Sequence, residues 1–283
     1  MFRVCRRYCG ADAVGLGIPG AEAMPFLVKP LLAAMANALF PARCLGCRQL
    51  FHRQAARAKE DGSEKSDAGR ALADYFCPVC SGQWTAVASP LCSRCGMVFK
   101  SRVGPDHFCG RCLERPGTFT RARAAGAYDG TLQLAIQALK FKGHTHLANP
   151  LGRLLYATYR HYWLDGDIDL IAPVPLHRRR FRRRGFNQAL LLVKAWPLSG
   201  EVVMVRDLLA RNRPTPPQTG LDRRQRRINI KNAFGVSRPG ESVGKRVLLV
   251  DDVLTTGATA EACATALLKD GAKRVDVLTL ARA

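Results

Sequence analysis

Two adjacent aspartates, Asp251 and Asp252, stand between an apolar stretch and a turn rich in threonine. The stretch before them, residues 247–250, is Val-Leu-Leu-Val, as a strand buried on both faces of a parallel sheet requires. The turn after them, residues 255–259, is Thr-Thr-Gly-Ala-Thr and leads into apolar residues at helical spacing. Carboxylates accept hydrogen bonds from neighbouring hydroxyls, while threonine hydroxyls and the free N–H groups of a helix start bind phosphate. The pattern predicts a site for a phosphorylated sugar, such as a 5-phosphorylated ribose.

Residues 247–259 together resemble the motif with which type I phosphoribosyltransferases bind 5-phosphoribosyl 1-pyrophosphate (PRPP). The alternative is an ordinary strand, turn and helix with aspartate as a helix cap. A cap needs neither a second acid nor three hydroxyls, so we favour the ligand site. The acids are expected at the carboxyl end of the strand, where open α/β sheets bind ligands. The residues predicted to cradle the phosphate are Thr255, Thr256, Gly257, Ala258 and Thr259.

Eight of the eleven cysteines form Cys-x-x-Cys pairs. The pairs are Cys44 and Cys47, Cys77 and Cys80, Cys92 and Cys95, and Cys109 and Cys112. Eight thiolates suffice for two tetrahedral zinc sites. We expect neighbouring pairs to share a metal, since the 13 residues between the third and fourth pairs suit a hairpin. A crossed arrangement, with the first pair joined to the third, stays open.

A structural role for zinc is favoured over a catalytic one, because four thiolates leave no open coordination position. A redox role is less favoured, since no thioredoxin-like context surrounds the pairs. Paired thiols also suit a reducing compartment better than a secreted protein. The apolar segment at residues 25–40, behind several arginines, is therefore not interpreted as a signal peptide.

Four regions are expected to position these groups. Residues 1–23 are predicted to be a disordered tail, or to lie upstream of a true start at Met24, and residues 24–40 form an amphipathic helix. Residues 41–116 form a double zinc-ribbon module with an inserted loop at about 53–75. Residues 117–283 alternate apolar strands and helices, which predicts a mainly parallel, doubly wound α/β sheet. Its strands are expected at residues 122–128, 168–174, 202–205, 247–250 and 275–280.

Two basic segments follow strands of this predicted sheet. In the first, six arginines run from Arg178 to Arg184 directly after Leu176 and His177. Type I phosphoribosyltransferases bind pyrophosphate with a loop here, which implies a role for the Leu176 and His177 backbone N–H groups. Of the arginines only Arg184, just before Gly185, is predicted to contact the ligand, and most of the others form a solvated basic face.

The second segment, residues 211–229, is longer than an ordinary connection and typical of an active-site lid. The transferase family carries a flexible loop here that closes over its substrate. A surface patch for nucleic acid fits the charge equally well. The whole chain has 44 lysines and arginines against 22 acids, a net charge of +22 that favours polyanionic partners. No apolar run reaches the roughly 18 residues of a transmembrane segment, so a soluble protein is expected.

Nearly the whole chain from Pro25 onward resembles the ComF family of competence-associated phosphoribosyltransferase-domain proteins. The resemblance rests on the cysteine pairs and on further segments. These are residues 121–129, 139–141, 173–177, 184–189, 215–218, 229, 233–234 and 251–259. Departures from the family are the loop after Cys47, the density of arginine and the N-terminal extension. The resemblance implies a cytoplasmic protein with a zinc module, needed with the competence machinery of some bacteria for taking up single-stranded DNA.

Two functions follow from these patterns. In the first, the protein is an enzyme that binds PRPP with Mg²⁺, holds the ribose hydroxyls with Asp251 and Asp252, and stabilises departing pyrophosphate with Arg184. The acceptor is not specified by any segment. In the second, the protein binds single-stranded DNA without catalysis and uses the sugar-phosphate pocket for binding or regulation. Its aromatic content of 7% offers few stacking platforms for bases.

Overall fold

The computed structural model describes residues 35, 41–52, 72–101, 103–198, 200, 202–213, 225, 230 and 232–283. The predicted N-terminal tail, the helix at 24–40 apart from Met35, most of the inserted loop and nearly all of the predicted lid lie outside these residues. The chain divides into two units, Met1–Pro41 and Ala42–Ala283. Every contact described below lies within the second unit.

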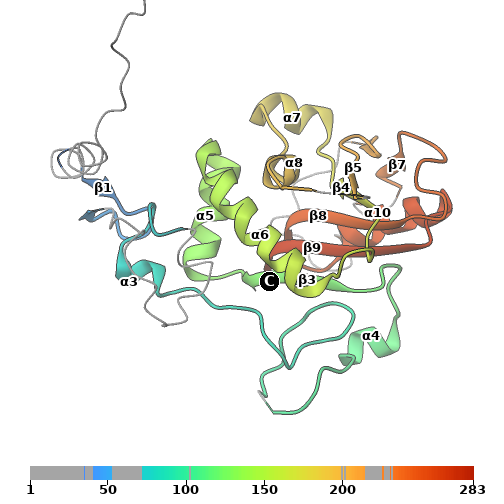
Figure 1. The fold of residues 1–283 in the computed structure, drawn as a ribbon, viewed down its shortest axis with the longest axis horizontal. Helices are drawn as coiled ribbons and strands as arrows, with labels where there is room; N and C mark the ends of the chain where they lie inside the picture. Colours follow the sequence, from blue (N-terminus) through green and yellow to red (C-terminus); the bar gives the residue numbers. More distant parts are fainter. Residues whose placement is uncertain are drawn as a thin grey trace, which may run out of the picture. The chain divides into compact units, whose positions relative to one another are not determined.

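A five-stranded sheet in the order β3-β9-β8-β4-β5 forms the centre of this unit (Figure 1). All of its described pairings are parallel. The strands are β3 (Ala122–Ala127), β4 (Leu170–Pro173), β5 (Val203–Met204), β8 (Arg246–Leu254) and β9 (Arg274–Arg282). Each lies where the sequence predicts a strand, so the mainly parallel sheet is confirmed.

Helices cover both faces of the sheet, because alternate residues of its central strands are apolar on both sides. Leu248 and Val250 of β8 belong to one core, with α5 (Gly130–Phe141), α6 (Ala148–Tyr162) and α8 (Gln188–Val193). Val247 and Leu249 belong to the other core, with α10 (Ala258–Lys269). A short 3₁₀ helix, η1 (Thr145–Leu147), precedes α6. The fold is therefore doubly wound, as the alternation of strands and helices predicts.

The order of the strands reverses between β4 and β8. The chain passes from β4 through α8 to β5 on one side, and from β8 through α10 to β9 on the other. At such a switch point the connections leave in opposite directions and open a crevice at the carboxyl ends of the strands. Both Asp251 and the segment after Pro173 lie at this edge.

Two features differ from the sequence-based expectation. The arginine segment after β4 is a short helix, α7 (Arg178–Arg184), whereas the resemblance to type I phosphoribosyltransferases implies a loop there. Strands β6 (Leu209–Arg211) and β7 (Phe234–Val236) form an antiparallel pair outside the main sheet and flank the predicted lid. No described helix has the length and apolar character that a membrane crossing demands.

The cysteine-rich region contains the same small unit twice. β1 (Ala42–Arg43) and β2 (Leu50–Phe51) flank the first cysteine turn, and the bridge between Leu91 and Val98 flanks the third. Short helices begin after the first cysteine of the other two pairs, namely α3 (Pro78–Ser81) and α4 (Gly110–Glu114). Each unit thus joins a hairpin turn to a helix start, as a zinc ribbon does.

Candidate active site and metal centres

A pocket of about 490 Å³ occupies the switch point. Its walls come from the ends of α5 and β8, the segment between β4 and α7, and the turn into α10. The sequence-predicted site residues that line it are Asp251, Asp252, Arg184, Leu176, Thr255, Gly257, Ala258 and Thr259. Thr256 and His177 are not among its lining residues. Leu176 and Asp251, 75 positions apart in the chain, thus line one pocket, because parallel strands bring their carboxyl ends to the same edge of the sheet.

The two aspartates differ in environment. Asp252 is 4% exposed, and its Oδ2 lies 2.8 Å from the Nζ of Lys140, near the end of α5. Asp251 is partly accessible from the pocket, and its Oδ1 accepts a hydrogen bond of 2.8 Å from the Asp252 backbone N–H. Burial, and then the charge of Asp252, raise the pKa of Asp251 to about 7. An added cation or a set of hydroxyl donors would stabilise the ionised pair.

Oxygen donors of this kind fit Mg²⁺, which binds proteins through one or two carboxylates and takes its other ligands from water and substrate phosphates. Asp251 and Asp252 supply carboxylates at the pocket wall, and the neighbouring turn offers room for a phosphorylated ligand. The pocket therefore has the donor set expected for a metal that arrives with its substrate.

The turn at residues 255–259, the phosphate loop hereafter, joins β8 to the start of α10. Gly257 has φ +83° and is the N-cap of α10, a left-handed conformation that glycine adopts without strain. The hydroxyl of Thr256 accepts from the Ala258 N–H at 3.4 Å, so this side chain is used inside the loop. Thr255 and Thr259 line the pocket instead. The N-terminal end of the 12-residue α10 faces the same cavity with its dipole, which favours an anion there.

The arginine helix α7 stands on the opposite wall. It ends at Gly185, which has φ +84°, and the guanidinium of Arg184 lies 5.7 Å from the centroid of the Phe141 ring. Arg184 also donates to Oε1 of Gln188. Burial lowers the pKa of Arg184, while the charges of Asp252 and Asp251 act in the opposite direction. Arg184 therefore lines the same cavity as the acid pair.

The side chain of His177 caps α7, whereas the role predicted for this residue concerns its backbone N–H group. Its Nδ1 accepts from the Arg179 N–H at 3.2 Å and so caps α7. Partial burial, and then nearby arginines, lower the pKa of His177, which favours the neutral ring that can accept this hydrogen bond. The neighbouring residue Leu176 lines the pocket.

Four cations at the pocket were not predicted as site residues, namely Lys140, Arg180, Arg183 and Arg211. The sequence assigns no role to Lys140, yet its Nζ pairs with Oδ2 of Asp252. Arg180 and Arg211 were assigned to the basic segments, yet both line the cavity, and Arg211 is 8% exposed with its guanidinium 5.2 Å from the Phe234 ring centroid. Two features of the sequence could have indicated Lys140. It follows Leu139, the last core position of an amphipathic helix, and it lies in the segment 139–141 that resembles the ComF family.

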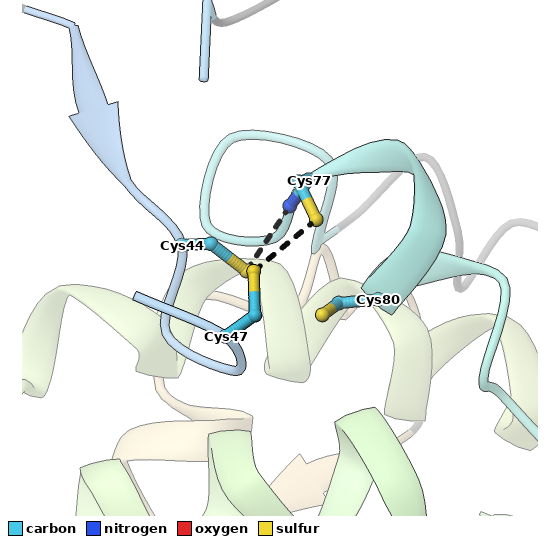
Figure 2. A group of neighbouring side chains, drawn as sticks. All are labelled: Cys44, Cys47, Cys77 and Cys80. Carbon is cyan, nitrogen blue, oxygen red and sulfur yellow. Dashed lines mark hydrogen bonds between the residues drawn. The ribbon is translucent and has the colours of Figure 1, made fainter. Parts of the chain in front are cut away.

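The eight paired cysteines form two clusters. In each, the four Sγ atoms lie within 4.8 Å of one another. Cys44, Cys47, Cys77 and Cys80 make up the first, with their sulfurs turned toward a common centre (Figure 2). Cys92, Cys95, Cys109 and Cys112 make up the second. Neighbouring pairs therefore share a site, as expected, and the crossed arrangement is wrong for this structure.

Backbone N–H groups prepare both clusters for anionic sulfur. The Cys77 N–H donates to Sγ of Cys44 at 3.3 Å, and the Cys109 N–H donates to Sγ of Cys92 at 3.4 Å. Burial alone would raise the pKa of Cys44 and of Cys92, but these N–H groups and others lower each to about 6. Four sulfurs with N–H support fit tetrahedral zinc, and they leave no position open for a substrate.

The two cysteine turns repeat the same backbone geometry. The residue after the second cysteine is left-handed in both, with φ +67° at Arg48 and +62° at Gly96. Its N–H donates to the carbonyl of the first cysteine, Cys44 or Cys92, at 3.0 Å and 2.9 Å. At Gly96 a Cβ would lie 2.6 Å from the carbonyl oxygen of Ala122, so only glycine fits.

Comparison with known proteins agrees with this geometry. A family model described as a phosphoribosyl transferase domain matches residues 201–283. DNA utilization protein YhgH of Escherichia coli O157:H7 is 38% identical over 212 residues, which cover 73% of this chain and 90% of that protein. Competence protein F of Haemophilus influenzae is 34% identical over 210 residues, which cover 72% of this chain and 90% of that protein. Competence protein ComFC of Bacillus subtilis is 24% identical over 213 residues, which cover 75% of this chain and 79% of that protein. The chain belongs to the ComF family of phosphoribosyltransferase-domain proteins.

Proposed function

We propose that the protein binds PRPP with Mg²⁺ in the pocket at the switch point and transfers the phosphoribosyl group, releasing pyrophosphate. The observation that carries the proposal is the meeting of the acid pair, the phosphate loop and Arg184 around one cavity. Each group matches a different part of the ligand: hydroxyls, phosphate and pyrophosphate. The protein would act in the cytoplasm, where thiol clusters stay reduced.

The ribose end of the ligand would be held by the aspartates. Asp251, with its raised pKa, and Asp252, neutralised in part by Lys140, would accept hydrogen bonds from the vicinal ribose hydroxyls. The 5′-phosphate would lie against the N–H groups of the phosphate loop and the Thr255 and Thr259 hydroxyls. Two anchors on one sugar fix its orientation and expose its anomeric carbon to the cavity.

The leaving group would face α7. As the bond between the anomeric carbon and the pyrophosphate oxygen breaks, the electron pair leaves with pyrophosphate, and an acceptor lone pair forms the new bond at that carbon. Arg184 would stabilise the charge that develops on pyrophosphate, and a guanidinium suits this because it donates two parallel hydrogen bonds. When bound, Mg²⁺ would neutralise part of the pyrophosphate charge, and Asp251 and Asp252 would hold the metal directly or through water.

The test is pyrophosphate release from PRPP in the presence of Mg²⁺, across a panel of bases and amines. We expect release that depends on one acceptor class and falls by about 100-fold or more in Asp252→Asn, the scale of losing a stabilising group at the reacting centre. Asp165→Asn changes an exposed acid that pairs with Arg160 and serves as the matched control. Wild-type protein that binds PRPP yet releases no pyrophosphate with any acceptor would contradict catalysis.

A second candidate function, binding of single-stranded DNA, is supported by the outer face of α7. Arg178, Arg179 and Arg182 are exposed there, beside Phe181, which is 48% exposed. A row of guanidiniums with an aromatic ring suits a phosphate backbone and a stacked base. The relatives named for DNA utilization and competence suggest the same partner.

This candidate predicts a steep salt dependence. Contacts with about four phosphates give a slope near −3 in a plot of log affinity against log salt, since each contributes about −0.7 for a single strand. Replacing Arg178, Arg179 and Arg182 together by serine should reduce the slope to about −1. Negligible binding of single-stranded DNA at moderate salt would contradict this second function, and it would not bear on the proposal that the pocket binds PRPP.

A further inference from the structure

The phosphate loop is attached by its carbonyl oxygens to the second zinc-ribbon unit, residues 92–112. Arg111 lies between Cys109 and Cys112 in α4, and its Nη1 donates to the carbonyl of Thr256 at 3.2 Å. The two residues are 145 positions apart in the chain. A side chain held between two cysteines of one cluster thus contacts the turn that faces the pocket.

Arg282, at the end of β9, makes the same link from the other side. Its Nε donates to the carbonyl of Cys95 at 3.2 Å, while its Nη1 donates to the carbonyls of Leu254 and Thr255 at 2.9 Å and 2.7 Å. One guanidinium therefore joins the cysteine turn of the second cluster to the start of the phosphate loop. Its planar, fixed set of donors makes this a rigid connection.

A third contact holds the helix behind the loop. The Thr118 N–H and hydroxyl donate to Oε2 of Glu261 at 2.7 Å and 2.6 Å, and Glu261 lies in the first turn of α10. The ring of Phe119 packs near Gly257, where an added Cβ would lie 3.8 Å from it. The segment just after the second cluster thus fixes the first turn of α10.

These contacts determine which way the loop N–H groups point. In a trans peptide the carbonyl of one residue and the N–H of the next point in opposite directions. Arg111 and Arg282 hold the carbonyls of Leu254, Thr255 and Thr256 toward the second zinc-ribbon unit. The N–H groups of the same three peptide units, on residues 255–257, are thereby directed away from it, on the side of the anion site.

We propose that Arg111 and Arg282 are positioning residues for the phosphate loop, and that the second four-cysteine cluster thereby sets the affinity for the 5′-phosphate. The inference rests on the proposed function and deepens it. It gives the second zinc ribbon a role in ligand binding that the first, which contacts α5 through the bond from Thr131 to the Cys80 carbonyl, does not share.

The test compares the affinities of Arg111→Met and wild type for three ligands: Mg²⁺–PRPP, ribose 5-phosphate and Mg²⁺–pyrophosphate. We expect Arg111→Met to bind the first two about tenfold more weakly, the scale of one lost hydrogen bond from a charged donor. Pyrophosphate, which lies at the α7 side, should keep its affinity within about twofold. Arg115→Met, at the exposed end of α4, is the control and should bind all three as wild type does.

Zinc content and circular dichroism establish that each variant keeps its metal and its fold. Should Arg111→Met lose zinc, Arg111→Lys takes its place, since it keeps the positive charge beside the thiolates but loses the planar fork. Unchanged affinity for ribose 5-phosphate, or an equal loss for pyrophosphate, overturns the positioning role. A wild-type protein that binds neither PRPP nor ribose 5-phosphate overturns the proposed function itself and this inference with it.

Discussion

The raised pKa of Asp251 makes a quantitative prediction: Asp251→Asn should stabilise the ligand-free protein at alkaline pH. The folded protein holds this carboxyl beside Asp252 in a pocket, so ionisation costs more there than in the unfolded chain. Raising the pKa from 3.8 to about 7 corresponds to about 4 kcal/mol, at 1.36 kcal/mol for each pKa unit. Because Asp251 is partly accessible, we expect about half of this value, ~2 kcal/mol.

The sign follows from proton linkage. Below about pH 4 Asp251 is largely protonated in both states, so its environment costs the folded state little. Between pH 4 and 7 the folded state retains a proton that the unfolded state has lost, and stability falls as pH rises. Above pH 7 Asp251 is ionised in both states, and the folded state bears the full free-energy cost of its ionisation. Asparagine resembles the protonated acid and avoids the cost at every pH.

The assay is urea unfolding of both proteins at pH 4 and pH 8 without ligand. The free energy of unfolding of Asp251→Asn should exceed that of wild type by ~2 kcal/mol at pH 8 and by less than about 1 kcal/mol at pH 4. Asp207→Asn, an exposed acid whose pKa is lowered by Arg238, is the control and should not gain stability at pH 8. The reasoning is refuted if the gain is absent at pH 8 or is the same at both pH values.

Three further predictions concern other parts of the structure. Lys140→Met should lower the free energy of unfolding in urea by about 3 kcal/mol, because Asp252 would be left as a buried charge without this partner. Lys142→Met, at an exposed position, is the control and should have little effect. Gly96→Ala should lower the free energy of unfolding by more than about 2 kcal/mol and reduce the zinc content, since φ is +62° and the added Cβ would overlap the carbonyl oxygen of Ala122. Gly110→Ala is the control and should change neither quantity, because its Cβ would meet nothing within 4 Å. Complete release of metal should yield two zinc ions per chain with a colorimetric chelator, and cysteine-to-serine changes in either cluster should reduce this to one; a single ion in wild type would contradict two filled sites.

The sequence predicted the parts of the site that are local in the chain. Strand β8, the acid pair and the start of α10 lie within one continuous segment, where apolar pattern and turn chemistry agree. The cysteine spacing likewise predicted two four-cysteine clusters, because a Cys-x-x-Cys turn brings two sulfurs together by itself.

The parts that were missed depend on tertiary contacts. Lys140 meets Asp252 only after α5 packs on the sheet, and the apolar pattern of this helix predicts its core face but not the partner of Lys140. The arginine segment was expected as a loop, yet Gly185 and the His177 cap allow it to close as α7. The contacts of Arg111 and Arg282 join segments 145 and 27 positions apart, and no spacing rule could have revealed them.

The measurement that tests the central claim most directly is a structure of the protein with PRPP and Mg²⁺ bound. The account predicts the ribose hydroxyls on Asp251 and Asp252, the 5′-phosphate on the N–H groups and hydroxyls of residues 255–259, and pyrophosphate turned toward Arg184. Density for PRPP on the outer face of α7, with the acid pair and the threonine turn left without ligand, would contradict it.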